Sequence, residues 1–600
     1  MSRRCARASA KHFSQSDSGL FKEGRRSKRA GLQSTLAPGG AAFDDLVVST
    51  KGVVTRRNCL EGLGALGAGS LLGGCPAAEP IGDAAAAEPV EQVPKLDAGS
   101  QVPVDPESAA PKPEPKPEPE PEPEPKAAPP APTPRRPHVL FLSIDDLNDW
   151  VGVLGGHPQA RTPNIDALAG AGMLFANAHC SAPSCNGSRT ATLTGLAPSS
   201  TGVYGNAQPW RQHLPDAVTL PEYFRRNGYR SLGAGKLFHG QFPDPRGWDE
   251  FHPSLCRQKP ERRKGAAKPK RAEGGAKFGT LAWGPLEGLD SDMGDAQTVD
   301  WVIDHLPKAD DPPTFLACGL YRPHLPWRVP QKWFDLFPLD TIELPDVRAD
   351  DRDDIPRSVI KRLTFDNDHK KIVAKGQWKA AVQAYLAASA FADAMVGRLL
   401  TALRESAAAN DTIVMLWSDH GWHLGEKLKW RKFTLWEEAT RVPLIITGPG
   451  VPSPGVCDRP VSLLDLYPTL VELCELPPRS DLEGQSFANL LTHPNAGRKR
   501  DAVTTWGRGN HSVRTNRWRY TRYRDGAEEL YDHKADPNEW TNLATKPKHA
   551  ELVARLGARL PKKSVRGAPR RKSYTKAQLD CDPSVYFEDD DSEDGDAAED

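Results

Sequence analysis

The amino-acid sequence predicts an α/β fold, in which a mostly parallel sheet lies between helices and a small antiparallel sheet follows near the C-terminus. Two continuous apolar runs, residues 138–144 and 412–417, are typical of strands buried on both faces of a parallel sheet. Amphipathic stretches separate these runs, and strands that alternate with helices indicate a parallel sheet covered on both faces. From residue 512 to residue 540 the pattern changes to short alternating segments, which predict the antiparallel sheet.

The remaining elements follow from the same patterns. Shorter apolar runs predict two further strands, at residues 314–319 and 442–447. A segment rich in Lys, Arg and Gly, residues 256–277, predicts a mobile surface loop. Helices are predicted at residues 162–171, 378–404 and 463–476.

The composition indicates one globular block with unstructured flanks. The chain has 600 residues with 78 basic and 78 acidic side chains, so it lacks an overall basic field that would attract nucleic acid or an anionic membrane surface. Hydrophobic residues make up 38% of the chain and there are 56 prolines, so part of the chain is not expected to fold. Ten cysteines without a short repeated spacing do not indicate a disulfide scaffold in a chain of this length.

Residues 1–75 are predicted to form a basic N-terminal extension that ends in an export signal. An arginine pair at residues 56–57 precedes an apolar run, residues 61–74, that is too short to span a bilayer and stops at Cys75. This order resembles a twin-arginine signal followed by a lipoprotein box. It predicts export to the periplasm or cell surface, with a lipid on Cys75 as the one membrane contact. A translation start near Val48 would shorten the extension, and a buried helix with a chance arginine pair is the alternative.

Three further parts are predicted beyond this signal. Residues 76–136 alternate Pro with Glu and Lys, which favours polyproline II and predicts a semi-rigid linker. Residues 566–600 end in an acidic run that repels itself, and they predict a disordered tail. The globular part between them divides into a predicted catalytic domain, residues 137–500, and a smaller C-terminal subdomain, residues 501–565.

Acidic side chains follow the two long predicted strands. The first strand ends in Asp145 and Asp146, and the second is followed by Asp419 and His420. Ligands of open parallel sheets collect at the carboxyl ends of the strands, and adjacent buried carboxylates repel each other unless a cation lies between them. Oxygen ligands with few nitrogens favour one Ca²⁺ ion, or Mg²⁺, over zinc. Turn or helix-capping aspartates are the alternative for either pair alone.

One segment carries the strongest functional signal. Residues 185–195 read Cys-Asn-Gly-Ser-Arg-Thr-Ala-Thr-Leu-Thr-Gly, which resembles the sulfatase signature, where Cys or Ser is followed by x-Pro-x-Arg and then by Leu-Thr-Gly. Cys185 has Arg189 four residues on, whereas Cys180 has Ser184 at that distance, so Cys185 is the candidate nucleophile. On a helix that begins just after Cys185, residues four apart share a face, which predicts the guanidinium beside the nucleophile.

The resemblance to the sulfatases implies an alkaline-phosphatase/sulfatase-like fold and a specific chemistry. A formylglycine-generating enzyme would oxidise Cys185 to formylglycine. One hydroxyl of the hydrated aldehyde attacks the ester sulfur, and deprotonation of the other then releases sulfate. Cys185 in this form would also be a metal ligand. Gly187 stands where the maturation motif has proline.

Further matches extend over residues 137–545, in the order of the iduronate-2-sulfatase-like branch. Lys236 and His239 resemble an element in which the lysine contacts sulfate or formylglycine and the histidine acts as acid or base. His324 resembles a second histidine, which contacts sulfate or protonates the leaving alcohol, and Lys432 resembles a sulfate-binding lysine. Taken singly, each of these residues is more often an ordinary surface or capping group, so their shared order carries the argument.

The resemblance makes a sulfated carbohydrate the expected substrate. Two other functions stay open: a phosphoester or phosphonate hydrolase of the same fold, and a non-catalytic surface protein that binds sulfated glycans if Cys185 is not oxidised. Aromatic and basic side chains suit a sulfated sugar, although the tryptophans among them could equally be core or loop anchors. The candidates for the pocket wall are Asn148, Arg322, Trp327, Trp422, His423, Trp430 and Arg431.

Overall fold

The computed structural model describes residues 136–252 and 275–570, apart from residues 241, 245, 453 and 499. The predicted signal with Cys75, almost all of the linker and most of the predicted loop at 256–277 lie outside the described residues. The boundaries of the predicted domains stay predictions.

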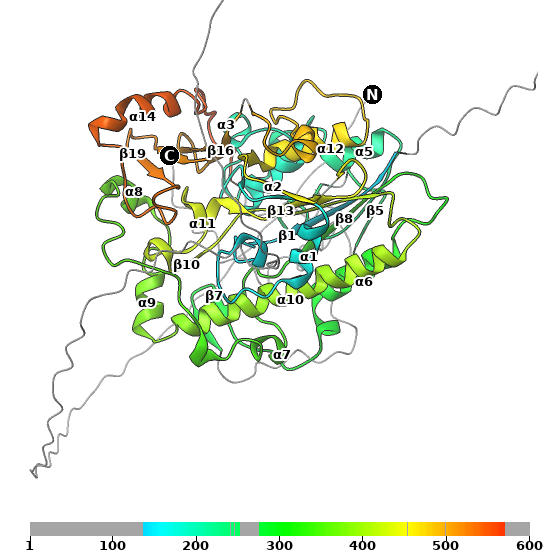
Figure 1. Cartoon of the computed structure of the whole chain (residues 1–600), viewed down its shortest axis with the longest axis horizontal. Coiled ribbons are helices and arrows are strands. Elements are labelled where there is room, and N and C mark those ends of the chain that lie inside the picture. The colour runs from blue at the N-terminus through cyan, green and yellow to red at the C-terminus, as the bar shows by residue number, and fades with distance from the viewer. Residues whose placement is uncertain are drawn as a thin grey trace, which may run out of the picture. The chain divides into compact units, whose positions relative to one another are not determined.

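An eight-stranded sheet forms the centre, in the order β14-β2-β13-β9-β1-β8-β4-β5 (Figure 1). The five strands from β9 to β5 run parallel to one another, and β13 is antiparallel to β9. The predicted mostly parallel sheet is therefore confirmed. The strands are β1 (His138–Ile144), β2 (Met173–Phe175), β4 (Arg230–Gly235), β5 (Glu250–His252), β8 (Thr314–Leu320), β9 (Thr412–Ser418), β13 (Leu444–Thr447) and β14 (Gly455–Cys457).

Helices cover both faces of this sheet. On one face lie α1 (Pro163–Ala171), α6 (Gly294–Asp304) and α10 (Trp378–Glu405). On the other lie α2 (Cys185–Thr194), α5 (Leu220–Arg226) and α12 (Leu466–Leu473) (Figure 1). β1 serves both cores, since its alternate side chains point to opposite faces: those of Leu140 and Leu142 join the first cluster and those of Val139 and Phe141 the second.

The length and composition of α10 would allow it to cross a membrane, but 72% of its most apolar window is buried inside the protein. It packs against α1 and α6 as a core helix. The predicted helix over 378–404 is confirmed. The one predicted over 463–476 is a 3₁₀ turn, η5 (Leu463–Asp465), that continues into α12.

Shorter elements connect these layers. The strand predicted at 442–447 is interrupted at Pro443, which has no N–H for the ladder and separates β12 (Arg441–Val442) from β13. The end of the predicted loop at 256–277 enters strand β6, which pairs with β7. The short strands are β3 (Ala178–His179), β6 (Ala276–Phe278), β7 (Leu281–Trp283), β10 (His423–Leu424), β11 (Trp430–Arg431), β12 (Arg441–Val442) and β15 (Val461–Ser462). The short helices are η1 (Gly152–Leu154), α3 (Pro198–Thr201), α4 (Trp210–His213), η2 (Asp290–Asp292), α7 (Gln331–Phe334), η3 (Leu339–Thr341), α8 (Arg357–Arg362), α9 (Asp368–Ala374), η4 (Glu426–Leu428), α11 (Glu437–Thr440) and α13 (Ala488–Thr492).

The C-terminal antiparallel sheet is confirmed, with four strands in sequence order and helices η6 (Pro547–His549) and α14 (Ala550–Gly557) after it. It begins before the predicted residue 512 and ends before 540. Buried Arg519 ties it to the rest of the fold through an ion pair with Glu437 of α11, and the same guanidinium pairs with Glu539 at 2.5 Å. Its strands are β16 (Ala502–Thr505), β17 (His511–Arg514), β18 (Trp518–Arg522) and β19 (Glu528–Asp532).

The first residues of the predicted tail at 566–600 contact the folded part of the chain. The N–H of Ala568 donates to the carbonyl oxygen of Gly202 at 2.8 Å, and that of Val565 to Ser199 at 2.9 Å. Ala568 is buried. The acidic composition of the following residues hid this contact, because these hydrogen bonds use backbone groups that any residue type supplies.

Candidate active site

The two central strands bring the predicted acidic residues to one edge of the sheet. β1 and β9 are parallel neighbours with Ile144 opposite Ser418, so the residues that follow them leave the sheet side by side. The N–H of Asp146 donates to Oδ1 of Asp419 at 3.1 Å. All four residues predicted here are buried: Asp145, Asp146, Asp419 and His420.

Cys185 lies at the first turn of α2 and faces three cationic or ionisable groups. Its Sγ is 3.1 Å from Nζ of Lys432, 3.8 Å from Nζ of Lys236 and 3.3 Å from Nε2 of His420. Burial opposes ionisation of the thiol, but Lys236 and Lys432 overcome it and hold the pKa of Cys185 well below its ordinary value. For Cys180, by contrast, burial raises the thiol pKa. The opposite shifts in thiol pKa therefore favour Cys185 over Cys180 as the nucleophile, as the sequence motif does.

The two lysines also neutralise the acidic pair. Nζ of Lys236 is 2.5 Å from Oδ2 of Asp145, and Nζ of Lys432 is 3.0 Å from Oδ1 of Asp146. Burial acts against ionisation of Asp145, yet Lys236 and its other positive neighbours hold the pKa of this carboxyl well below its usual range. The two ammonium groups thus pair with different carboxylates and both lie near the sulfur of Cys185. This arrangement can hold a tetrahedral oxyanion.

Arg189 acts on the carboxylates rather than on the sulfur. Its Nε is 2.8 Å from Oδ2 of Asp419 and its Nη2 is 3.2 Å from Oδ1 of Asp145, and all three side chains are buried. Its Nη1 donates to the carbonyl oxygen of Lys236 at 2.6 Å. The guanidinium therefore positions two predicted metal ligands and the loop of one lysine, a role that the i, i+4 spacing alone did not predict.

The same acidic residues fit a metal ion. Asp145, Cys185, Asp419 and His420 each place a ligand atom within 4.8 Å of the others. A second group of the same kind adds Asp146 and contains His324, which the sequence did not predict as a ligand. Oδ2 of Asp146 is buried and has no hydrogen-bond partner among the described residues, and burial raises the pKa of this carboxyl despite Lys432. A divalent cation would compensate this charge, so the donor set fits the predicted cation.

The two predicted acid/base histidines differ in placement. Nε2 of His324 is 3.9 Å from Oδ2 of Asp146 and 4.0 Å from Oδ2 of Asp145, so this ring belongs to the cluster. His239 is buried and its ring packs 6.1 Å from that of Phe242. Within the described residues, Nδ1 of His239 has no hydrogen-bond partner. Its catalytic role stays a prediction.

Sequence reasoning missed the residues that position Asp146 and Asp419. Tyr385 of α10 donates its hydroxyl to the carbonyl oxygen of Asp146 at 2.8 Å and accepts from the N–H of Asn148 at 3.0 Å. Asp146 has a φ of 60°, a left-handed conformation that side chains with a β-carbon rarely adopt. Ser188 donates to the carbonyl oxygen of Asp419 at 2.6 Å. Only the position of Ser188 within the signature could have pointed to any of these contacts.

Most of the predicted substrate contacts belong to the interior. Trp327, Trp422 and Trp430 are fully buried in the core cluster that also holds α10, which favours the alternative that they are anchors. Arg431 is paired with Asp368 at 2.8 Å. The other three residues also make internal contacts: Asn148 with Trp422, Arg322 with the carbonyl oxygen of His324, and His423 with Thr434.

Gly187 occupies a crowded position in the first turn of α2. A β-carbon there would lie 2.8 Å from Oγ of Ser184 and 3.0 Å from the carbonyl oxygen of Tyr204, and these two atoms already share a hydrogen bond of 2.9 Å. The site therefore has no room for a larger residue unless the neighbouring loop moves.

We expect Gly187→Ala to lower the free energy of unfolding by about 1–2 kcal/mol, because overcrowding outweighs the better helix propensity of alanine. Gly170→Ala is the matched control, since Gly170 lies in α1 and a β-carbon there would meet no atom of the described residues within 4 Å. Gly170→Ala should raise the free energy of unfolding by roughly 0.5–1 kcal/mol. Urea unfolding of both variants measures the difference, and a stabilised Gly187→Ala would contradict the crowding argument.

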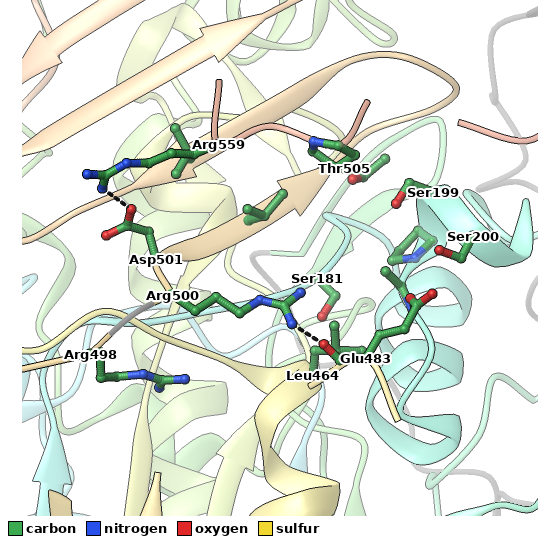
Figure 2. Close-up of a pocket in the computed structure, with 15 residues that line it drawn as sticks. Ser181, Ser199, Ser200, Leu464, Glu483, Arg498, Arg500, Asp501, Thr505 and Arg559 are labelled. Atoms are coloured by element: carbon green, nitrogen blue, oxygen red, sulfur yellow. Dashed lines mark hydrogen bonds and ion pairs between the residues drawn. The ribbon is translucent and has the colours of Figure 1, made fainter. Parts of the chain in front are cut away.

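A cavity of about 700 Å³ lies between α3 and the C-terminal sheet. Figure 2 shows that its charges are largely compensated: Arg559 pairs with Asp501, and Arg500 donates to the carbonyl oxygen of Glu483. Arg498 in the same wall pairs with Asp465 at 2.9 Å. This cavity therefore offers little uncompensated charge to a ligand.

Comparison with known proteins agrees with this geometry. The family model named Sulfatase matches residues 137–476, and the model of the C-terminal part of N-sulphoglucosamine sulphohydrolase matches residues 425–566. A sulfatase from Formosa agariphila is 41% identical over 447 residues, which cover 71% of this chain and 87% of that protein. Iduronate 2-sulfatase from Homo sapiens is 33% identical over 413 residues, covering 59% of this chain and 74% of that one.

Among solved structures, the phosphonate monoester hydrolase of Agrobacterium radiobacter has a TM-score of 0.60 at 23% identity, over 70% of this chain and 94% of that chain. At this identity the likeness shows the shared fold alone. The family match over more than half of the chain shows the sulfatase family and makes the phosphonate hydrolase the weaker alternative. The chain belongs to the sulfatase family, in its iduronate-2-sulfatase-like branch, and is a sulfuric ester hydrolase.

Proposed function

We propose that this enzyme removes sulfate from a sulfated carbohydrate, with a formylglycine made from Cys185 as nucleophile and one divalent cation, Ca²⁺ in preference to Mg²⁺, beside it. One observation carries the proposal. Cys185 Sγ lies between Nζ of Lys432 and Nζ of Lys236, next to carboxylates that fit a cation. Its sulfur stands in for the oxygen atoms of formylglycine, which would supply a nucleophile and an internal route for sulfate release.

The residues of this chain would share the remaining work. Lys236 and Lys432 would bind the sulfate oxygens and stabilise the negative charge that develops on them in the transition state. His324, at the rim of the cluster, would donate a proton to the leaving alcohol, with His239 as the second candidate. Arg189 would hold Asp145 and Asp419 in place. The cation would be held by Asp145, Asp146, Cys185 in its oxidised form, Asp419 and His420, and would polarise the sulfate.

The carbohydrate substrate is inferred by similarity. A relative in the same branch carries the name iduronate 2-sulfatase, which is the name of a sugar sulfatase. Sulfate release from a sulfated oligosaccharide, with matched phosphate and phosphonate esters in parallel, tests the proposal. A faster reaction with the phosphorus esters would support the phosphonate hydrolase alternative instead.

Maturation by a formylglycine-generating enzyme is the step on which this chemistry depends. Mass spectrometry of the peptide that contains Cys185, from protein made in its own host, measures it directly. An aldehyde supports the proposal, and an intact thiol supports the non-catalytic glycan-binding alternative, for which Gly187 in place of proline is the one sequence feature.

Removal of the cation should abolish sulfate release and lower the melting temperature, because it leaves a buried oxygen of Asp146 that has no hydrogen-bond partner in the described part of the chain. Ca²⁺ at about 100 times its dissociation constant should restore roughly 2.7 kcal/mol of stability. Thermal unfolding with chelator and then with added Ca²⁺ or Mg²⁺ measures this effect and ranks the two ions. An unchanged melting temperature in all three conditions would contradict a cation at this site.

We also propose that the enzyme is exported and is anchored by a lipid on Cys75, since the arginine pair, the apolar run and the cysteine occur in the order of such signals. Metabolic labelling with a fatty acid tests this part, with Cys75→Ala as the unlabelled control. Export by a twin-arginine route carries folded proteins, so oxidation of Cys185 would then take place in the cytoplasm.

A further inference from the structure

A cavity of about 890 Å³ lies beside the catalytic centre. One wall contains Phe433, which follows Lys432 in the chain and whose N–H donates to the carbonyl oxygen of Pro183 at 3.2 Å. Another contains Gly205 and Gln208, whose carbonyl oxygens accept from Nδ2 of Asn186 at 2.9 and 2.8 Å. The lining thus contains the chain neighbour of Lys432, and two further lining residues bind Asn186, the chain neighbour of Cys185.

The end of the described chain completes this cavity. Nε2 of Gln208 donates to the carbonyl oxygen of Ala568 at 2.8 Å, and the hydroxyl of Tyr204 donates to that of Val565 at 2.8 Å. These contacts place Arg566 and Arg570 in the wall. A segment far from Cys185 in sequence is thus fixed to the loop that holds the residue after this cysteine.

The cavity wall is strongly basic. It contains four arginines and one histidine, and among the described residues that line it there is no aspartate or glutamate. Arg508, Arg524 and Arg566 are exposed, and no carboxylate in the described part of the chain forms an ion pair with them. The cavity shown in Figure 2 differs, because aspartates pair with two of its arginines, Arg559 and Arg498. Arg508 instead donates to the carbonyl oxygen of Ser564 at 3.2 Å. The basic side chains are those of His213, Arg508, Arg524, Arg566 and Arg570.

Aromatic side chains line the same wall. Trp506 is partly exposed beside the arginines, whereas Tyr204 and Phe433 are buried in the wall. Planar guanidinium groups bind sulfate and carboxylate through paired N–H donors, and the partly exposed ring of Trp506 offers an apolar surface against which the apolar face of a sugar ring can pack. The lining thus combines both kinds of contact that an acidic sugar needs.

We propose that this cavity binds a second oxyanion, a sulfate or a carboxylate, on the carbohydrate chain whose sulfate ester is cleaved. The enzyme therefore prefers substrates with at least two negative groups, one at Cys185 and one at the arginines. This inference rests on the proposed function, the removal of sulfate from a carbohydrate. It narrows the substrate to carbohydrates that carry at least two negative groups.

Binding can be separated from hydrolysis in the full-length Cys185→Ala protein. The probe is a heparin-derived tetrasaccharide, and its dissociation constant is measured by calorimetry at low salt. Adding Arg524→Gln and Arg566→Gln together should raise this constant about tenfold or more, because two charge-assisted contacts are lost. Arg404→Gln is the matched control, an exposed arginine at the end of α10 outside the cavity wall, and it should leave the constant unchanged. Melting temperatures confirm that each variant folds.

In enzyme with Cys185 intact, the double variant should also lower kcat/KM for the tetrasaccharide relative to a singly charged aryl sulfate by about tenfold. A dissociation constant within twofold of the parent protein would overturn the inference, as would an equal loss in Arg404→Gln. Equally tight, equally variant-sensitive binding of a DNA duplex would overturn the carbohydrate as ligand. Variant-sensitive tetrasaccharide binding by a protein that releases no sulfate would instead overturn the proposed function and keep the anion site.

Discussion

Cys185→Ala is expected to lower kcat/KM for sulfate release by at least about 10⁴-fold, because it removes the side chain from which the nucleophile is made. The protein should still fold. Lys432 keeps its contact with Asp146 at 3.0 Å, and Lys236 keeps its contact with Asp145 at 2.5 Å. Release of sulfate from an aryl sulfate, measured with saturating Ca²⁺, gives the ratio, and the melting temperature reports on folding.

Cys180→Ala is the matched control for this loss. Cys180 is a buried thiol of the same segment, with its Sγ 3.7 Å from the carbonyl oxygen of Ala439, and burial raises its pKa instead of lowering it. Its replacement should leave sulfate release within about threefold of the parent enzyme, as for a small change in packing. A large loss of sulfate release in Cys180→Ala, with activity kept in Cys185→Ala, would show that Cys180 and not Cys185 supplies the nucleophile.

Sequence patterns predicted the fold well where they report burial on both faces of a sheet. The apolar runs at residues 138–144 and 412–417 form the two central strands, β1 (His138–Ile144) and β9 (Thr412–Ser418), and acidic residues of the site follow both strands. This agreement has a physical cause. A parallel strand with helices on both sides must be apolar throughout its length, and its polar residues are therefore confined to its ends.

The patterns failed where a role depends on partners from distant segments. Spacing placed Arg189 on the face of Cys185, but it could not show that the guanidinium reaches Asp419 and Asp145, which come from two other loops. Trp327 and Trp422 suited a sugar-binding surface by type alone, whereas they pack at a centroid distance of 5.9 Å in the core. The segment around Ala568 has no apolar periodicity, so its docking on Gly202 through backbone hydrogen bonds left no trace in the sequence.

The candidate active site and the C-terminal sheet each contain one buried arginine that pairs with two carboxylates. Arg189 is buried between two carboxylates in the site, and Arg519 is buried between Glu437 and Glu539 away from it. Removing one partner of a buried pair leaves a buried charge without compensation. The two arginines differ in one respect, since a cation is proposed beside Arg189 and not beside Arg519.

Arg189→Met should therefore lower the free energy of unfolding by about 3–5 kcal/mol in the presence of chelator, because Asp145 and Asp419 lose their shared counter-charge. Added Ca²⁺ should recover part of this loss, since the cation binds the same carboxylates. Arg519→Met should lower the free energy of unfolding by a similar amount. Added Ca²⁺ should stabilise this variant no more than it stabilises the parent protein. Urea unfolding of both variants, with chelator and with Ca²⁺, makes the comparison. Equal recovery in the two variants, or a loss below about 1 kcal/mol in Arg189→Met, would show that this guanidinium does not share its carboxylates with a metal ion.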